Sequence, residues 1–276
     1  MAVDISRREF LGAAGAATVA LAGMSLVGCS SSDDEDEGSA EEEEEEEEDT
    51  EAVTYIIATD TTFAPFEFTN EDNEFVGIDV DLLDACMEIA GLDYELQSLG
   101  FDAAVAALES GQADGVIAGM SITEEREENY DFSDPYYESY VCAAAADGGD
   151  ITSLEDCDGL TVACKVGTQS ASWAESIADE YGFEISYFDS SDLMYQDVTT
   201  GNSACCFEDY PVMAYGVQQG NGLTIIATEE DEYATPYGFA VLKGENQELL
   251  EGFNTGLAEL QETGEYDEIL SKYLDA

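Results

Sequence analysis

Residues 160–188 read LTVACKVGTQSASWAESIADEYGFEISYF, and this stretch contains the repeating unit of the fold. LTVACKVG is a short apolar run that is typical of a buried strand, and EISYF is a second run of the same kind. Between them, TQSASWAESIADEYG has the pattern of a helix and ends in Gly182. A helix that joins two short apolar strands predicts an α/β fold.

The same alternation of strands and helices runs through both halves of the chain. The other expected strands are residues 53–60, 92–99, 113–120, 203–209 and 223–228. The other expected helices are residues 77–91, 101–111, 191–201 and 210–220, with one more helix at the carboxyl end. This order predicts two α/β lobes, each with a mostly parallel sheet at its centre.

The amino-terminal segment predicts export and lipid attachment. Within SRREFLGAAGAATVALAGMSLVGCS, a twin-arginine pair precedes a stretch rich in Gly and Ala that ends before Cys29. We interpret residues 1–28 as a twin-arginine export signal and Cys29 as a lipoprotein cysteine, because the stretch is too weakly apolar for the alternative, a membrane span. The acidic residues 29–52 are expected to form a disordered tether. The protein would then be lipid-anchored on the outer face of the cell membrane.

The composition limits the partners that the protein can have. The chain has 65 acidic and 6 basic residues and a formal net charge of −59, which argues against binding to nucleic acid or to an anionic bilayer surface. Histidine is absent and no C-x-x-C pair occurs, so neither a metal site nor a cofactor is expected. The sequence leaves the pairing of its cysteines open.

Polar residues gather where the expected strands end, and ligands of α/β sheets bind at that edge. Arg126 follows one such strand, although this chain has few basic residues. An arginine suits bidentate capture of a carboxylate, whereas the alternative is an exposed pair with a neighbouring glutamate. Asp209, with the Gly119 carbonyl and the Ser121 hydroxyl, would suit an ammonium group. Taken alone, Asp209 reads as a surface or capping acid, and only its place at a strand end beside Pro211 favours the site. Together these groups predict a site for an α-amino acid.

Five stretches in order resemble the polar amino-acid family of bacterial extracytoplasmic solute-binding proteins, the receptors of ABC importers, and most closely its glutamine-binding member. They are ATDTTFAPFEF, FVGIDVDLL, AGMSITEEREENYDFSDPYYES, KVGTQ and TGEYDEILSKYL. The resemblance covers nearly all of residues 53–276. It implies a two-lobed periplasmic-binding-protein type II fold with two crossover hinge strands. Lobe 1 would comprise residues 53–139 and 237–276, and lobe 2 residues 140–236.

The resemblance also implies a role for each site residue. The residues expected to hold the ligand carboxylate are Arg126, Ser121, Thr168 and Gln169, and those expected at the ammonium are Asp209, Gly119 and Ser121. The residues expected around the ligand side chain are Asp60, Lys165, Phe63, Phe101 and Glu208. Phe63 and Phe101 read equally as core residues. Gln169 replaces a glycine of the family and Glu208 a histidine, so these two positions affect which side chain is accepted.

The resulting prediction is a monomeric, non-catalytic receptor that delivers an amino acid to a membrane permease and its ATPase. Glutamine is favoured because Asp60 and Lys165 would repel a charged side chain of one sign or the other. Two alternatives stay open from the sequence. One is a dehydratase of cyclic amino-acid precursors on the same fold, and the other is an amino-acid sensor or surface protein.

Overall fold

The computed structural model describes residues 53–274. The expected export signal, Cys29 and the acidic tether lie outside the described residues. Within residues 53–274, no helix combines the length and the apolar character that a membrane crossing needs.

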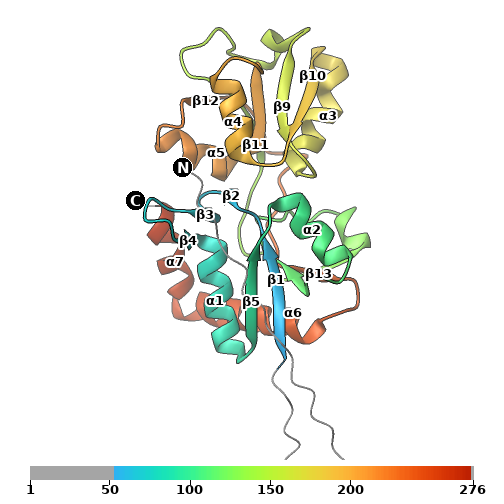
Figure 1. Cartoon of the computed structure of the whole chain (residues 1–276), viewed down its shortest axis with the longest axis vertical. Coiled ribbons are helices and arrows are strands. Elements are labelled where there is room, and N and C mark those ends of the chain that lie inside the picture. Colours follow the sequence, from blue (N-terminus) through green and yellow to red (C-terminus); the bar gives the residue numbers. More distant parts are fainter. Residues whose placement is uncertain (1–52, 275–276) are drawn as a thin grey trace, which may run out of the picture. The chain divides into compact units, whose positions relative to one another are not determined.

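The first lobe is built on a mixed sheet of five strands in the order β5-β1-β6-β13-β7 (Figure 1). These strands are β1 (Thr54–Thr59), β5 (Asp93–Ser98), β6 (Gly115–Val116), β7 (Tyr130–Phe132) and β13 (Ala240–Leu242). Its helices are α1 (Ile78–Ala90), α2 (Phe101–Glu109), α6 (Gln247–Thr263) and α7 (Glu265–Leu274). Neighbouring residues of β1 point to opposite faces of the sheet, because Ile57 packs with α1 and α6 whereas Ala58 packs with α2.

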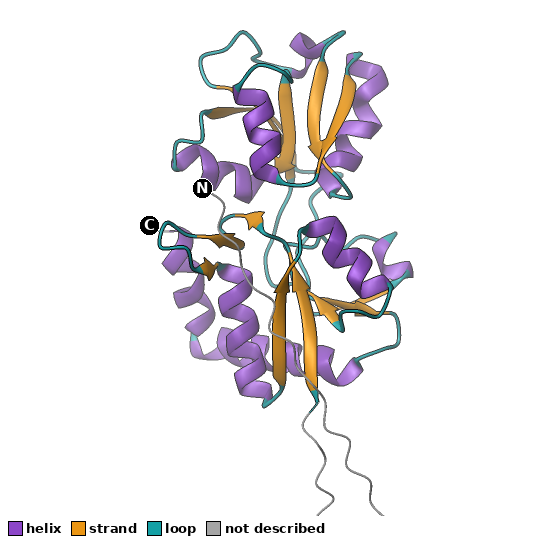
Figure 2. Ribbon diagram, in the orientation of Figure 1, coloured by secondary structure: helices purple, strands orange, loops and turns teal. Residues whose placement is uncertain are grey.

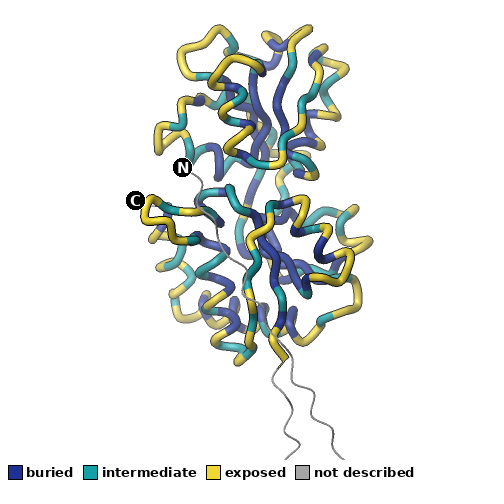
Figure 3. Tube along the Cα trace, in the orientation of Figure 1, coloured by how far each residue is buried: buried dark blue, intermediate teal, exposed yellow. Residues whose placement is uncertain are grey.

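The second lobe has a five-stranded sheet in the order β10-β9-β11-β8-β12. Its strands are β8 (Val141–Ala146), β9 (Thr161–Lys165), β10 (Glu184–Phe188), β11 (Cys205–Asp209) and β12 (Leu223–Glu229). Its helices are α3 (Gln169–Tyr181), α4 (Ser191–Thr199) and α5 (Tyr210–Gln218). Phe207 of β11 packs with Trp173 of α3 on one face, and Cys206 packs with Met194 and Met213 on the other. Both sheets are therefore buried on two sides (Figures 2 and 3).

Short elements complete the fold. A small antiparallel sheet contains β2 (Thr62–Phe63), β3 (Glu67–Thr69) and β4 (Phe75–Val76). Two 3₁₀ turns, η1 (Arg126–Glu128) and η2 (Leu154–Cys157), lie in the loops after β6 and β8. The first of these turns begins at Arg126, so the position of this arginine is set by the loop between β6 and β7.

Two segments connect the lobes, as the sequence predicts. They lie between β7 and β8 and between β12 and β13, and they run antiparallel to each other. The Tyr136 N–H donates to the Tyr237 carbonyl at 2.9 Å, the Tyr237 N–H donates to the Tyr137 carbonyl at 2.8 Å, and the Thr235 N–H donates to the Ser139 carbonyl at 3.0 Å. The expected lobe boundaries at residues 139/140 and 236/237 fall within these segments and stay a prediction.

The expected alternation is confirmed, and so is the expectation of mostly parallel sheets, because four of the five strands in each sheet run in one direction. The exceptions are β13 and β8. β13 is antiparallel to β6 and β7, and β8 is antiparallel to β11 and β12, because the chain changes lobe immediately before β8 and β13. The expected strand 113–120 is hydrogen-bonded as a strand only at Gly115–Val116. Beyond it, Gly119 has a φ of 52° and turns the chain out of the extended conformation.

Candidate functional site

Most of the predicted site residues line one small cavity that both lobes form. Its lining comprises Phe63, Phe101, Ala118, Gly119, Ser121, Arg126, Lys165, Thr168, Gln169 and Asp209. A larger cavity of about 550 Å³ lies between the small sheet and helices α4 and α5, but none of the predicted residues lines it. Because charged groups concentrate in the smaller cavity, it is the candidate site.

Arg126 reaches from the first lobe to the second. Its Nη1 donates to the Ser121 carbonyl at 2.8 Å, and its Nη2 donates to the Gly167 carbonyl at 3.0 Å. The guanidinium carbon lies 5.5 Å from the centroid of the Phe101 ring. Burial lowers the pKa of Arg126, whereas the charge of Asp209 acts against this shift. No acid within residues 53–274 forms an ion pair with Arg126, so the alternative of a surface pair with a neighbouring glutamate is not observed.

The amino end of α3 meets the cavity beside Arg126. Thr168 caps this helix, because its Oγ1 accepts from the Ala171 N–H at 3.2 Å. The Thr168 hydroxyl also donates to the Lys165 carbonyl at 2.9 Å, which fixes the loop between β9 and α3. The first N–H groups of a helix and its dipole favour an anion. Arg126 and this helix terminus therefore form one electropositive side of the cavity.

Asp209 at the end of β11 provides a negative group in the same cavity. Its Oδ2 accepts from the Tyr237 hydroxyl at 2.6 Å, and its Oδ1 is buried without a hydrogen-bond partner. Burial and the charge of Glu208 raise the pKa of Asp209 to about 7, against the effects of Tyr237, Arg126 and Lys165. Asp209 is only 5% exposed and makes no capping hydrogen bond, so neither alternative role, surface acid or helix cap, applies.

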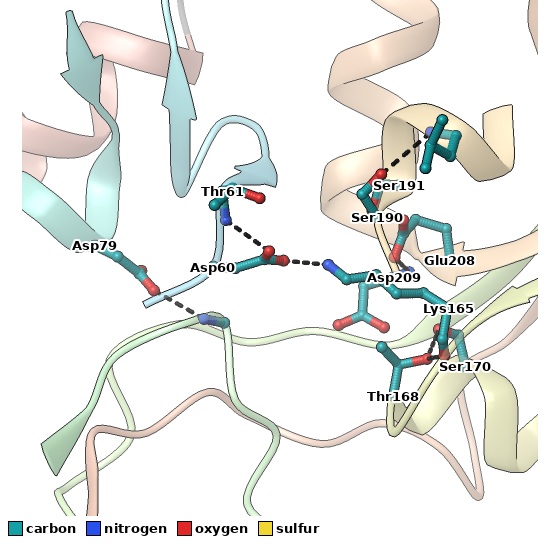
Figure 4. Close-up of polar contacts among 12 residues, drawn as sticks. Asp60, Thr61, Asp79, Lys165, Thr168, Ser170, Ser190, Ser191, Glu208 and Asp209 are labelled. Carbon is teal, nitrogen blue, oxygen red and sulfur yellow. Dashed lines mark hydrogen bonds and ion pairs between the residues drawn. The ribbon is translucent and has the colours of Figure 1, made fainter. Parts of the chain in front are cut away.

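Lys165, which lines the cavity, forms a buried ion pair with Asp60, which does not line it, and Figure 4 shows the two side chains meeting head to head. The predicted contact of Asp60 with a ligand side chain stays a prediction. The Lys165 Nζ also lies 4.8 Å from the centroid of the Phe63 ring and 5.9 Å from that of Phe101. The Asp60 Oδ1 accepts from the Thr61 N–H at 2.6 Å. Burial lowers the pKa of Lys165, but the charges of Asp60 and Glu208 outweigh it, so the pKa is raised overall. Lys165 is therefore a charged ammonium with a carboxylate partner.

Glu208 lies behind the cavity and is not part of its lining. Its Oε2 accepts from the Ser191 and Tyr195 hydroxyls, both at 2.8 Å, and its Oε1 accepts from the Asp209 N–H at 3.0 Å. Burial raises the pKa of Glu208, and the charge of Lys165 opposes this rise. Its predicted contact with a ligand side chain stays a prediction.

Tyr237 is a site residue that sequence reasoning missed. It lies in the second crossover segment, far from Asp209 in the sequence, and its hydroxyl donates to Asp209 while accepting from the Ser139 hydroxyl at 3.0 Å. Nothing in the local pattern around residue 237 indicates this contact. The alternation of lobes along the chain, which brings a crossover segment under the end of β11, was the only available signal.

Two α/β lobes that are joined by two crossover segments and enclose a small polar cavity are the architecture of two-lobed binding proteins. The chain belongs to family 3 of the bacterial extracellular solute-binding proteins, whose family model matches residues 55–276.

Named relatives and solved structures agree with this assignment. The chain is 32% identical over 220 residues to the arginine-binding extracellular protein ArtP of Bacillus subtilis (strain 168), a match that covers 79% of this chain and 85% of that protein. It is 37% identical, with a TM-score of 0.73, to the structure of an ancestral arginine-binding protein bound to arginine, which covers 80% of this chain and 98% of that one. A structure of an ancestral arginine-binding protein bound to glutamine gives 36% identity, a TM-score of 0.73 and coverages of 81% and 98%.

Proposed function

We propose that this protein is the receptor of an ABC importer and that it binds a polar α-amino acid between its lobes. The observation that carries this proposal is the separation of charge within one cavity. Arg126 and the amino end of α3 suit a carboxylate, and the unpartnered Oδ1 of Asp209 suits an ammonium group. An α-amino acid carries both groups on one carbon. The relative named for arginine binding and the solved structures with bound arginine and bound glutamine support the same ligand class.

Among amino acids, the charges near the side-chain end favour glutamine. A cationic side chain would approach the ammonium of Lys165, and an anionic one would approach Asp60, and both repulsions grow where water is excluded. A neutral amide avoids both, because its carbonyl accepts from Lys165 and its NH₂ group donates to Asp60. Glutamine therefore ranks first, ahead of other polar neutral amino acids and of arginine.

Competition calorimetry tests this ranking directly. The purified protein is freed of copurifying ligand, and mass spectrometry identifies what was bound. Glutamine, glutamate, arginine, histidine and cystine are then titrated under the same conditions. We expect glutamine to bind most tightly. Tighter binding of arginine would refute the argument from Lys165 and Asp60 but would keep the amino-acid receptor.

The protein acts in this proposal as a carrier without catalysis, anchored outside the cell through lipid on Cys29 and working as a monomer. The description of the family as extracellular supports this location. The competing function is a dehydratase of cyclic amino-acid precursors, in which a carboxyl group with a raised pKa, such as Asp209, would act as the acid. Product formed on incubation with arogenate or prephenate would favour the dehydratase.

A further inference from the structure

Two buried carboxyl groups lie next to the site without lining it. Glu67 is in β3 and Asp79 is in the first turn of α1, and both are 0% exposed. The N–H groups of Ile78 and Asp79 donate to the carbonyls of Pro65 and Phe66 at 3.0 and 2.9 Å. These bonds hold the start of α1 against the residues that precede Glu67, so that the two carboxyl groups interact with each other in the core.

The two carboxyl groups have very different surroundings. The Asp79 Oδ2 accepts from the Gly119 N–H and from the Tyr136 hydroxyl, both at 2.8 Å. Its position in the first turn of α1 also favours a negative charge. By contrast, neither oxygen of Glu67 has a hydrogen-bond partner, and the Asp79 Oδ1 has none either. The surroundings therefore stabilise an anion on Asp79 and leave an anion on Glu67 without any donor.

No basic side chain between residues 53 and 274 forms an ion pair with either carboxyl group. The lysines form ion pairs elsewhere, namely Lys165 with Asp60, Lys243 with Asp131 and Lys272 with Asp81. Arg126 donates to backbone carbonyls. Two neighbouring buried carboxyl groups without a cation cannot both ionise at an acceptable cost, so one of them retains its proton.

The electrostatics identify which of the two carboxyl groups retains its proton. Burial raises the pKa of Glu67 well above its usual value, and the charges of Asp79 and Asp60 add to this rise while Lys165 opposes it. Burial raises the pKa of Asp79 only to about 6, because the Gly119 N–H and the Tyr136 hydroxyl stabilise its ionised form. Glu67 is therefore the group that retains the proton near neutral pH.

We propose that protonated Glu67 donates a hydrogen bond to the free Oδ1 of Asp79, and that this carboxyl pair positions the ligand site. The backbone of Gly119 lines the cavity, and its carbonyl is the expected acceptor for the ligand ammonium, so this proposal rests on the proposed function. The hydrogen bond from the Gly119 N–H to Asp79 fixes that backbone. The bond from Tyr136 ties the same carboxylate to a crossover segment. Glu67 and Asp79 are positioning residues, since neither lines the cavity.

Infrared difference spectroscopy of the full chain tests the shared proton without any ligand. The spectrum of Glu67→Gln is subtracted from that of the wild type at pH 7. We expect the carbonyl band of a protonated carboxylic acid, present in the wild type and lost in the variant. Glu259→Gln, an exposed position in α6, is the matched control and should remove only carboxylate bands. A carboxylate band lost from Glu67→Gln would overturn the proposal.

Calorimetry with L-glutamine and L-arginine tests the positioning role. Asp79→Asn should weaken binding by at least about 10-fold, because an amide presents a poorer acceptor to Gly119. Glu67→Leu should lose about as much, since leucine cannot donate, whereas Glu67→Gln retains a donor and should lose about 3-fold or less. Equal losses in the two Glu67 variants would overturn the role of the donor. If the folded wild type binds none of the five amino acids of the competition experiment, the proposed function fails, while the infrared result still decides the shared proton.

Discussion

At the scale of single residues, the cavity contains side chains that use only part of their capacity to form hydrogen bonds. Arg126 has five N–H donors in its guanidinium, of which the structure uses Nη1 and Nη2 for one carbonyl each. Asp209 uses only Oδ2, for Tyr237. A zwitterionic ligand would supply a carboxylate to the first and an ammonium to the second. The site is thus complementary to a whole amino-acid head group. Loss of Arg126 should remove the partner of the ligand carboxylate, and loss of Asp209 should remove the partner of its ammonium group.

Arg126→Ala should abolish tight amino-acid binding while the protein stays folded. Removing the guanidinium leaves the ligand carboxylate buried without its charge-assisted hydrogen bonds, a loss of about 2–3 kcal/mol or roughly 30- to 150-fold in affinity. Calorimetry measures the affinity, and thermal unfolding followed by circular dichroism measures the fold. Lys243→Ala is the matched control, because Lys243 pairs with Asp131 at a side chain that is 55% exposed. Retained affinity with a large loss of stability would show that Arg126 is only structural.

The affinity should also depend on pH through Asp209. Its pKa of about 7 in the unliganded protein means that acidification neutralises the group expected to hold the ligand ammonium. Binding should therefore weaken as the pH falls from 8 to 6, because Asp209 of the unliganded protein takes up a proton over this range. Calorimetry across this range checks the slope. Asp209→Asn should bind weakly at every pH and lose most of the slope.

Stability without ligand should change with pH in the opposite direction. The pKa of Asp209 is raised from 3.8 to about 7 in the folded protein, so the folded state binds more protons than the unfolded state between these values. The contribution of Asp209 to stability is therefore greatest below pH 3.8 and is lost as the pH rises through 7. Its full size is about 4 kcal/mol. Urea unfolding at pH 8 and 5.5 should show this contribution as the difference between the wild type and Asp209→Asn.

At the scale of elements, the amino end of α3 combines a structural and a binding role. Its cap, Thr168, lines the cavity, whereas Ser190 caps α4 through the Leu193 N–H at 3.4 Å and lies outside the cavity lining. Substituting each of these two caps in turn separates the contribution of a helix cap to stability from its contribution to ligand binding.

Thr168→Ala and Ser190→Ala should each cost about 1 kcal/mol of stability, because each removes the acceptor for an N–H group at a helix start. Only Thr168→Ala should weaken ligand binding, since it loosens the backbone that is expected to meet the carboxylate. Urea unfolding measures the stability and calorimetry the affinity. Equal effects of both substitutions on affinity would argue against a role for the start of α3 in the site.

The helices and strands could be predicted from the sequence wherever the local sequence pattern agrees with burial in the fold. The unit at residues 160–188 is observed as β9, α3 and β10, because its apolar strands and its helix pattern are all local signals. β8 was not predicted, since its sequence VCAAAA has little β-propensity and becomes a strand only between β11 and β12. The predicted residues Arg126, Lys165 and Asp209 do line one cavity. Strands β9 and β11 end at Lys165 and Asp209, whereas the loop after β6 places Arg126. The contact of Tyr237 with Asp209 and those of Asp79 with Gly119 and Tyr136 join segments that lie apart in the sequence, and no local pattern encodes them.

At the scale of the whole molecule, three contacts connect one lobe to the other or to a crossover segment around the cavity. They are the hydrogen bond from Arg126 to the Gly167 carbonyl, the ion pair of Lys165 with Asp60, and the hydrogen bond from Tyr237 to Asp209. The first two of these contacts join the two lobes, so opening of the lobes would break them. Two backbone segments joined by few hydrogen bonds are a suitable hinge for such an opening.

Ligand should therefore shift the protein from an open to a closed arrangement of its lobes. A ligand that contacts Arg126 on one lobe and Asp209 on the other binds the closed arrangement more tightly than the open one, and this difference in affinity drives the shift. Small-angle scattering should show a smaller radius of gyration on saturation with the amino acid that calorimetry identifies. Arg126→Ala at the same concentration is the control and should show no decrease. An unchanged radius in wild-type protein that calorimetry shows to be saturated would contradict hinge closure, and the two lobes would then be a rigid frame around the site.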